Sequence, residues 1–378
     1  MSLHIVILNY SYEKQLDVEA LLARYFLLTG WAEGVYEAGG RITVLQRYKH
    51  DLTFERNGVT YCCVADGFGE TLRHRDIPLN LHRHSALATA HVAHLNGLIF
   101  PLQTLALRLK LPRTCPIVAQ HHGELPRTGL QGLAQRVGLR WADDFIFTTE
   151  GIAQDWRARG MIRKHQTTHE VLEGSSRFKP GDKARAQAET GLMGAPVVVW
   201  AGRLDENKDP LTVLNGFEQA LTHKPAMRLY IAHRGDGLLQ AVQDRIERSP
   251  LLREAVRLLG HVPHTQMEAL YQSADYFVLG SHHEGSGISL VEALACGVVP
   301  VVTHIPPFFS ITKSGAVGRL WVPSNADDFA RALLEVQQQP HNKLSAAVTE
   351  HFASALSFEA IGRKALQAYE TAYARKQS

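Results

Sequence analysis

The sequence has few of the features that mark secreted, disulfide-bonded or membrane-spanning proteins. Its 378 residues contain no Cys-x-x-Cys pair, and the two adjacent cysteines would rarely bridge each other. No apolar run reaches the roughly 18 residues that a membrane helix needs, and the first residues lack the basic start of a signal peptide. We therefore expect reduced, buried thiols in a cytoplasmic protein, for which any membrane contact would be peripheral. The four cysteines are Cys62, Cys63, Cys115 and Cys296.

Net charge is also low. The formal value is +3, which provides no strong positive field for binding nucleic acid. Basic residues nevertheless gather in three short segments of the N-terminal half. They are interpreted either as ordinary solvated surface or as a site for an anionic membrane or an anionic acceptor. The segments are Arg73-His74-Arg75, His82-Arg83-His84 and Arg163-Lys164-His165.

The chain has the size and composition of a globular protein with two domains. Hydrophobic residues make up 45% and charged residues 20%, and no repeat or low-complexity tract interrupts them. Apolar strand patterns alternate with helical patterns in both halves, which predicts α/β domains with parallel sheets. In the N-terminal half we expect strands at 5–8, 41–46 and 59–64 and a helix at 16–28.

The best linker candidate is the polar segment EVLEGSSRFKPGD, which contains Gly and Pro. It predicts an N-terminal domain over 1–178 and a C-terminal domain over 179–356. A final helix would occupy 357–378.

The stretch Ser281–Gly297, SHHEGSGISLVEALACG, carries the strongest local pattern. A buried-strand pattern at 274–279 precedes it, and another at 298–303 follows it. Between them lie a Gly-rich turn and a helix at about 287–296, with Gly297 at the position of a C-cap glycine. This order predicts a βαβ unit with two parallel strands.

Two carboxylates frame that unit. Glu284 lies in the turn, where Gly285 and Gly287 let the backbone approach a ligand and leave amides free at the helix N-terminus. Glu292 lies on an otherwise apolar helix and needs hydrogen-bond partners, which sugar hydroxyls would supply. The alternative places Glu292 on the solvated side of an ordinary helix.

A second charged pattern follows the apolar strand at 196–201. Gly202-Arg203 ends the strand, and Lys208 follows before a helix that starts near Pro210. Arginine offers a fork of donors and lysine a point charge, a combination that suits a diphosphate. The alternative is a pair of surface cations.

These segments together resemble the retaining glycosyltransferases of family 4. The two glutamates separated by seven residues, the following LACGVVPVV and the segment GRLDENK resemble the signatures of that family. The resemblance covers nearly the whole chain and implies the GT-B fold, two Rossmann-like domains that face each other across a cleft. It implies a nucleotide-sugar donor, no cofactor and no required metal, and the sequence shows no Asp-x-Asp at a strand end to hold one.

The resemblance also assigns roles in the C-terminal half. Glu292 would bind the ribose, and Glu284 would lie beside the transferred sugar. Gly202, Arg203 and Lys208 would hold the diphosphate, and the turn containing His261 and Val262 would contact the base through its backbone. The backbone amides that would contact the sugar or phosphates belong to Gly285, Ser286, Gly287 and Ile288.

Histidines follow two expected strand ends in the N-terminal half. His94 precedes Asn96-Gly97, and His121-His122-Gly123 follows the strand at 116–119, so both sets should face a crevice. His122 matches the family histidine near the transferred sugar, although the aspartate usual at the position of His91 is absent. The alternatives are structural histidines or a metal site built from His94, His121 and His122.

The first loop departs from the family pattern. Members usually carry a Gly-Gly pair there, facing the donor phosphates, whereas this chain has NYSYEKQLD. Gly39-Gly40 lies later and is typical of a turn. The departure indicates a different acceptor or a different path of the loop.

We interpret the protein as a retaining glycosyltransferase that moves a sugar from a UDP- or GDP-sugar to a hydroxyl of a saccharide or lipid-linked glycan. His122, Glu284, Arg203 and Lys208 are the candidate catalytic residues. The alternatives are a nucleotide-sugar epimerase or a phosphorylase of the same fold, or a non-catalytic subunit that binds nucleotide or glycan.

Overall fold

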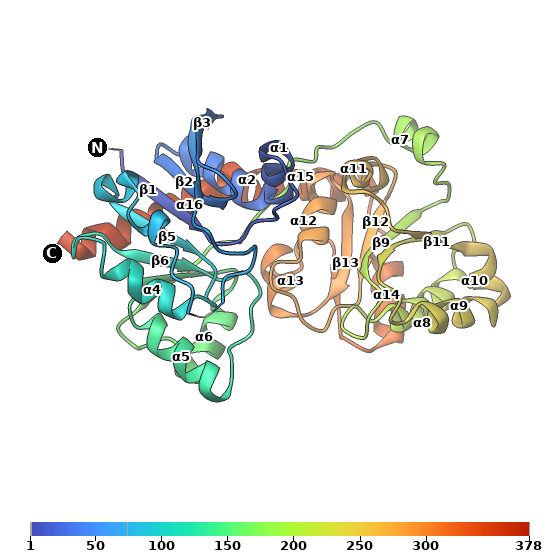
Figure 1. Ribbon diagram of the computed structural model, residues 1–378. Helices are drawn as coiled ribbons and strands as arrows, with labels where there is room; N and C mark the ends of the chain where they lie inside the picture. Colours follow the sequence, from blue (N-terminus) through green and yellow to red (C-terminus); the bar gives the residue numbers. More distant parts are fainter. Residues whose placement is uncertain (1, 74, 378) are drawn as a thin grey trace. The chain divides into compact units, whose positions relative to one another are not determined.

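The computed structural model describes residues 2–73 and 75–377 and consists of two compact units (Figure 1). Unit 1 ends at Ser175 and resumes at Phe358, and unit 2 is Ser176–Ser357. The sequence placed these boundaries after residues 178 and 356. The final helix is therefore part of unit 1. Each unit is an α/β structure around one mostly parallel sheet.

The described strands of unit 1 form an eight-stranded sheet in the order β3-β4-β2-β1-β5-β6-β7-β8. All neighbours run parallel except β3, which pairs antiparallel with β4. Asn57 and Gly58 join these two strands with positive φ angles, the geometry that favours a two-residue hairpin. Strand β3 was not predicted from the sequence, although Asn-Gly is a hairpin signal. The strands are β1 (His4–Asn9), β2 (Arg41–Tyr48), β3 (Leu52–Arg56), β4 (Val59–Ala65), β5 (Val92–Asn96), β6 (Ile117–Gln120), β7 (Asp144–Phe147) and β8 (Thr167–Glu170).

The helix expected at 16–28 is wrong in its bounds, because two helices occupy this region. Asp17 caps the first through the amide of Ala20, and the chain bends at Tyr25 before a longer helix that ends at Glu37. The second helix is buried over most of its length, so its sequence lacks the one-sided apolar pattern that would reveal its end. The helices of unit 1 are α1 (Val18–Arg24), α2 (Phe26–Glu37), α3 (Leu79–His82), the 3₁₀ turn at Ser85–Thr89, α4 (Pro101–Arg108), α5 (Gly129–Leu139), α6 (Glu150–Ala158) and α16 (Phe358–Gln377).

Unit 2 has a six-stranded parallel sheet in the order β11-β10-β9-β12-β13-β14. The expected βαβ unit is confirmed: β12 and β13 run parallel, and α12 joins them. Gly297 has φ 77° directly after this helix, as expected of a C-cap glycine. The strands are β9 (Val197–Arg203), β10 (Arg228–Arg234), β11 (Val256–Gly260), β12 (Tyr276–Leu279), β13 (Val299–Thr303) and β14 (Arg319–Trp321).

The other elements of unit 2 are helices. They are α7 (Lys183–Thr190), α8 (Pro210–Leu221), α9 (Leu239–Glu247), α10 (Pro250–Ala255), α11 (His264–Gln272), α12 (Ile288–Ala295), α13 (Pro306–Ile311), α14 (Ala326–Val336), α15 (His341–His351) and the π-helical turn at Phe352–Leu356.

Helix α16 packs on α2 within unit 1. A Cβ atom on Gly34 would meet the carbonyl oxygen of Phe358 at 2.1 Å, and one on Gly362 would meet the backbone of Gly34 at 2.2 Å. The two backbones approach this closely because neither residue has a side chain. Tyr369 of α16 accepts a hydrogen bond from Trp31 (3.0 Å) and bonds His94 Nδ1 (2.7 Å), which ties the final helix to α2 and β5.

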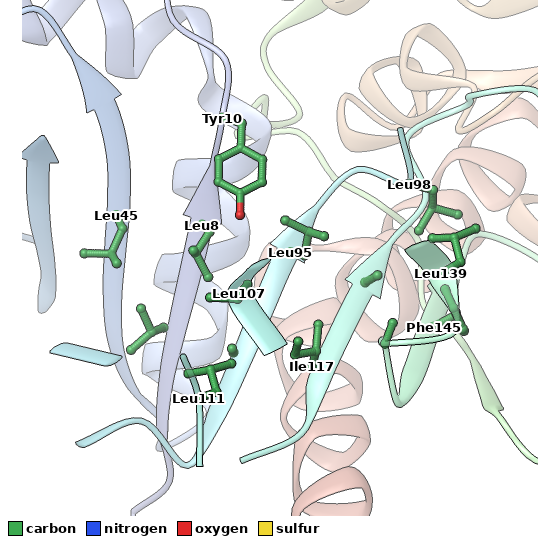
Figure 2. Close-up of a cluster of buried hydrophobic side chains, with 14 of the residues drawn as sticks. Leu8, Tyr10, Leu45, Leu95, Leu98, Leu107, Leu111, Ile117, Leu139 and Phe145 are labelled. Carbon is green, nitrogen blue, oxygen red and sulfur yellow. The ribbon is translucent and has the colours of Figure 1, made fainter. Parts of the chain in front are cut away.

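The core of unit 1 lies between its sheet and the covering helices. Figure 2 shows Leu8, Leu95 and Ile117, from three neighbouring strands, beside Leu107 of α4. All four cysteines are buried and free, as the sequence predicted. Among residues 2–73 and 75–377, no helix is long and apolar enough to cross a bilayer.

In both sheets, two adjacent strands are followed by chain segments that leave in opposite directions along the sheet. In unit 2 these strands are β9 and β12, and in unit 1 they are β1 and β5. Ligands of such sheets bind outside the carboxyl ends of these two strands. The fold therefore points to one candidate site in each unit.

Candidate functional site

In unit 2 the loops after β9 and β12 are bonded to each other. The side chain of Asn207 donates to the carbonyl of His283 and accepts from its amide, both at 3.0 Å. Gly280 passes close to the first loop, since a Cβ atom there would meet the carbonyl oxygen of Asp209 at 2.9 Å. These contacts place the GRLDENK segment against the turn that contains Glu284.

Lys208 and Glu284 form an ion pair at this junction. Both side chains are largely buried, and Glu284 also accepts a hydrogen bond from Ser281 Oγ at 2.7 Å. The residues that the sequence assigned to the diphosphate and to the sugar are thus in direct contact. A polar ligand at this point would meet a cation and a carboxylate side by side.

Arg203 has a different environment. Its side chain is 68% exposed and pairs with Asp205 at 3.0 Å. Gly202 precedes Arg203. A Cβ atom on Gly202 would lie 3.3 Å from the ring of Trp200 and 3.6 Å from the side chain of Lys208. Arg203 can therefore swing toward an anion, whereas Lys208 is held in place.

Glu292 is buried, with 6% of its surface exposed, so the alternative that places it on the solvated side of its helix is wrong. His264 Nε2 lies 2.9 Å from one carboxylate oxygen, and Tyr271 donates to the other at 3.3 Å. The hydrogen bond to Glu292 raises the pKa of His264. Burial raises the pKa of Tyr271, so its hydroxyl stays protonated and continues to donate.

The turn between Glu284 and α12 leaves the start of that helix open. Gly287 caps the helix in the left-handed region (φ 60°), and a Cβ atom there would meet the ring of Phe308 at 2.8 Å. No side chain caps the helix and no acidic residue lies in its first turn. Gly285, Ser286 and Ile288 thus surround a helix N-terminus whose amides can receive an anion.

The turn after β11 leads into α11, the helix whose His264 and Tyr271 bond Glu292. His261 is exposed and Val262 half-buried, and His264 begins α11 directly after this turn. Phe178 stacks on His264 with ring centroids 5.1 Å apart. His264, Tyr271 and Phe178 were not predicted from the sequence. Only the packing of α11 on α12 brings His264 and Tyr271 to the carboxylate, and Phe178 packs on these two rings.

In unit 1, His122 lies at the end of β6. Its amide donates to Glu124 at 2.6 Å, and the other oxygen of Glu124 accepts from Leu98 (2.9 Å). The Nε2 atom of His122 is buried and has no hydrogen-bond partner among the described residues. Burial lowers the pKa of His122 to about 4, so the ring is neutral at pH 7.

The histidines do not form the metal site that was one alternative. His94 is fully buried rather than facing a crevice, and its Nδ1 binds Tyr369. Both ring nitrogens of His121 bond the backbone, one to Glu124 (2.9 Å) and one to Gly123 (3.3 Å). No group of three His, Cys, Asp or Glu residues in the described parts of the chain could hold a metal ion.

A pocket of about 580 Å³ lies at the carboxyl ends of β1 and β5. Its walls combine aromatic rings with charged side chains, and the altered first loop forms one of them. The aromatic residues are Tyr10, Tyr12, Tyr25 and Phe100, and the charged residues are Glu13, Glu70, Arg73 and Arg127.

The first loop is hydrogen-bonded to side chains of β2. Arg47 is fully buried, pairs with Asp66 at 2.5 Å and donates to the carbonyl of Tyr10 at 2.9 Å. Gln46 donates to the carbonyl of Ser11 at 2.7 Å. The segment that replaces the family's Gly-Gly pair is therefore an ordered wall of this pocket.

One of the three basic segments is partly uncharged. His82 is buried, bonds the hydroxyl of Tyr10 at 2.7 Å, and has a pKa lowered to about 4 by burial. In the segment at 73–75, His74 lies outside the described residues, and Arg73 faces the pocket. The segment Arg163-Lys164-His165 is exposed.

Comparison with known proteins identifies the family. Residues 182–351, nearly all of unit 2, match the family described as "Glycosyl transferases group 1". Unit 2 therefore carries the domain that this family model describes. A GDP-mannose:cellobiosyl-diphosphopolyprenol alpha-mannosyltransferase from Xanthomonas campestris is 30% identical over 239 residues, which cover 61% of this chain and 60% of that relative.

Solved structures confirm the GT-B fold that was expected from the sequence. Sucrose-phosphate synthase from Thermosynechococcus elongatus aligns with a TM-score of 0.66 at 18% identity, covering 99% and 100% of the two chains. HepE from Anabaena, solved in complex with UDP and glucose, aligns with a TM-score of 0.67 at 16% identity and 97% and 99% coverage. At these identities the likeness concerns the fold alone.

Proposed function

We propose that this group 1 glycosyltransferase moves a sugar from a GDP- or UDP-sugar to a hydroxyl of a saccharide or lipid-linked glycan, with retention of configuration and without a required metal. The observation that carries the proposal is the Lys208–Glu284 ion pair between the loops after the neighbouring strands β9 and β12, together with the buried carboxylate of Glu292 on the helix that follows β12. The Xanthomonas relative is named for GDP-mannose and HepE was solved with UDP, so both bases are candidates.

In this proposal the donor lies across the carboxyl ends of β9 and β12. The ribose hydroxyls donate to Glu292, while the open amides of α12 and the guanidinium of Arg203 receive the diphosphate. Glu284 accepts from a hydroxyl of the sugar. Lys208, already paired with Glu284, lies between sugar and phosphate and neutralises the charge that develops on the leaving group.

Retention would follow from departure and attack on the same face of the sugar. The bond from the anomeric carbon to the phosphate oxygen breaks as the acceptor oxygen bonds to that carbon. The acceptor's proton passes to the departing phosphate oxygen, so atoms and charge balance without a protein nucleophile. The chain supplies orientation and electrostatic stabilisation of the phosphate.

Unit 1 would supply the acceptor site. The aromatic and charged walls of its pocket suit a sugar, since rings cover the apolar faces and charged groups bond the hydroxyls. The family resemblance predicts that His122 contacts the transferred sugar, and this stays a prediction. Because its pKa is lowered, it would act as a neutral hydrogen-bonding group.

The test is a calorimetric screen of GDP, UDP and ADP, each with and without a chelator. We expect one nucleotide to bind in the presence of chelator, and Glu292→Gln and Glu292→Ala to weaken that binding at least about tenfold. Glu335→Ala, which removes an exposed glutamate of α14, is the matched control and should bind as the wild type does. Equal affinity in all variants would refute the ribose role, and absence of binding to every nucleotide would favour the non-catalytic alternative.

A further inference from the structure

Helix α5 packs with its polarity reversed. Apart from Leu139 at its end, the residues that face the interior of unit 1 are small or polar, whereas Leu130 and Leu133 face solvent. Gln135 is fully buried, donates to the carbonyl of Leu98 at 3.0 Å and accepts from the amide of Arg127 at 2.9 Å. Most amphipathic helices of globular proteins bury the opposite face.

Two glycines explain how the helix is held without Leu130 and Leu133. A Cβ atom on Gly132 would meet the carbonyl oxygen of Arg127 at 2.3 Å, and one on Gly138 would meet Cα of Pro101 at 2.3 Å. Backbone contacts and the buried amide of Gln135 thus fasten α5 to unit 1. Its exposed apolar side chains are not needed for this packing.

The exposed side chains form a continuous stripe. Their positions place them within an arc of about 100° around the helix axis, extended by one residue just past its end. Leu130 is 86% exposed, and Leu125 in the preceding loop is 84% exposed. The stripe consists of Leu130, Leu133, Ala134, Val137 and Trp141.

The surroundings of this stripe are positively charged. Residues 97–142 contain six Lys and Arg residues and one acidic residue, Glu124. The next two residues, Asp143 and Asp144, are acidic but largely buried and paired with basic side chains. The two oxygens of Glu124 accept hydrogen bonds from the backbone amides of His122 and Leu98. Arg136 on α5 and Arg140 at its C-cap are exposed on one side of the stripe.

We propose that this face of α5 is a docking surface for an anionic membrane. Apolar side chains on one arc with arginines beside them are the pattern of helices that lie in a bilayer interface. A second copy of the chain fits less well, because a twofold contact through α5 would bring Arg136 and Arg140 near their own symmetry mates. The assignment does not depend on the proposed transfer reaction.

The position of this face has a further consequence. Arg127, just before α5, lines a smaller apolar pocket next to Leu130 and also lines the large pocket at the ends of β1 and β5. A membrane bound along α5 would therefore hold its headgroups close to the pocket that we assign to the acceptor.

The experiment is a vesicle flotation assay with the full chain. We expect binding to vesicles containing about one-third phosphatidylglycerol and much weaker binding to pure phosphatidylcholine, with a steep decrease as salt is raised. Leu130→Ser/Leu133→Ser should lower the bound fraction at least about tenfold. Arg136→Glu/Arg140→Glu should lower binding to anionic vesicles by a similar factor.

Matched controls lie in exposed positions elsewhere. Met193→Ser/Val322→Ser removes two exposed apolar residues of unit 2, and Arg363→Glu/Lys364→Glu makes the same charge change on α16, so both should bind as the wild type does. Thermal unfolding identifies any variant that fails to fold. Failure to bind any vesicle, or equal loss in the controls, would overturn the proposal. A dimer in sedimentation equilibrium that Leu130→Ser/Leu133→Ser abolishes would overturn it in favour of a second copy.

Discussion

Lys208 and Arg203, the two cations proposed to bind the diphosphate, differ in how they are held. Lys208 is largely buried against Glu284, whereas Arg203 is exposed beside Asp205. Removing Lys208 leaves a buried carboxylate without its counter-charge, which costs stability as well as activity. Removing Arg203 leaves no buried charge without a partner, because Asp205, with which it pairs, is itself solvent-accessible.

We predict that Arg203→Ala and Lys208→Ala each reduce kcat by about 10²-fold or more, as expected for groups that stabilise developing charge. Lys208→Ala should also lower the melting temperature, and Arg203→Ala should not. The control is Lys224→Ala, an exposed cation at the end of α8, which should retain wild-type turnover. Near-normal kcat in Arg203→Ala would remove its assignment to the diphosphate.

Glu292 illustrates how a binding residue is kept ready. In the free protein His264 and Tyr271 occupy its two oxygens, so the buried charge is satisfied without a ligand. The hydrogen bond also raises the pKa of His264, which stabilises the charged imidazole near neutral pH. A ribose hydroxyl that replaces His264 as the hydrogen-bond partner of Glu292 would remove the interaction that raises the pKa of His264.

We predict that nucleotide binding near pH 7 releases up to about one proton, since the pKa of His264 falls back toward its ordinary value. Calorimetry in buffers of different ionisation enthalpy measures this number directly. In His264→Gln, which keeps a hydrogen-bond donor without a titrating ring, the release should vanish. A buffer-independent binding enthalpy in the wild type would contradict the displacement of His264.

At the scale of elements, the contact between α2 and α16 depends on glycine. Gly30, Gly34 and Gly362 leave space for the other helix, and a Cβ atom on Gly30 would lie 2.3 Å from the ring of Phe358. In a free helix, Ala is more stable than Gly by about 1 kcal/mol. A destabilising effect of Gly→Ala here would therefore report the close packing.

We predict that Gly34→Ala lowers the free energy of unfolding of unit 1 by about 1–3 kcal/mol, because the added methyl overpacks the interface. Hydrogen exchange in α16 should accelerate selectively. Gly69→Ala is the control, since a Cβ atom there would meet nothing within 4 Å. A more stable Gly34→Ala variant would show that the two helices can separate without cost.

At the scale of the whole molecule, the two units should respond differently to acid. The described histidines whose pKa is lowered by burial all lie in unit 1: His4, His82, His84, His94, His121 and His122. The unfolded chain binds protons at these groups at higher pH than the folded chain does. Stability of unit 1 therefore decreases as pH falls below 6.5. His264 of unit 2 has a raised pKa and contributes stability that is fully present below pH 6.5.

We predict that acidification from pH 7 to 5 destabilises unit 1 first, by up to about 1.4 kcal/mol per pH unit for each such histidine. Hydrogen exchange read separately for peptides of the two units measures this. His82→Gln removes one titrating ring while keeping a hydrogen-bonding group near Tyr10, and should lessen the pH dependence. Equal loss of protection in both units would contradict the assignment.

The sequence by itself determined the α/β class, the βαβ unit at Ser281–Gly297 and the family resemblance, because these depend on local periodicity, glycine positions and short motifs. The positions of residues within one loop or helix follow from the local sequence. Glu284 and Glu292 could therefore be selected as candidate site residues from their spacing in the turn and the helix.

Tertiary structure decided which of these groups touch. The strand order puts β9 beside β12 and so pairs Lys208 with Glu284, 76 residues apart in the chain. Packing of α11 on α12 supplies the partners of Glu292, and burial makes His94 a structural residue instead of a ligand. Such contacts join segments distant in sequence, and no local pattern records them.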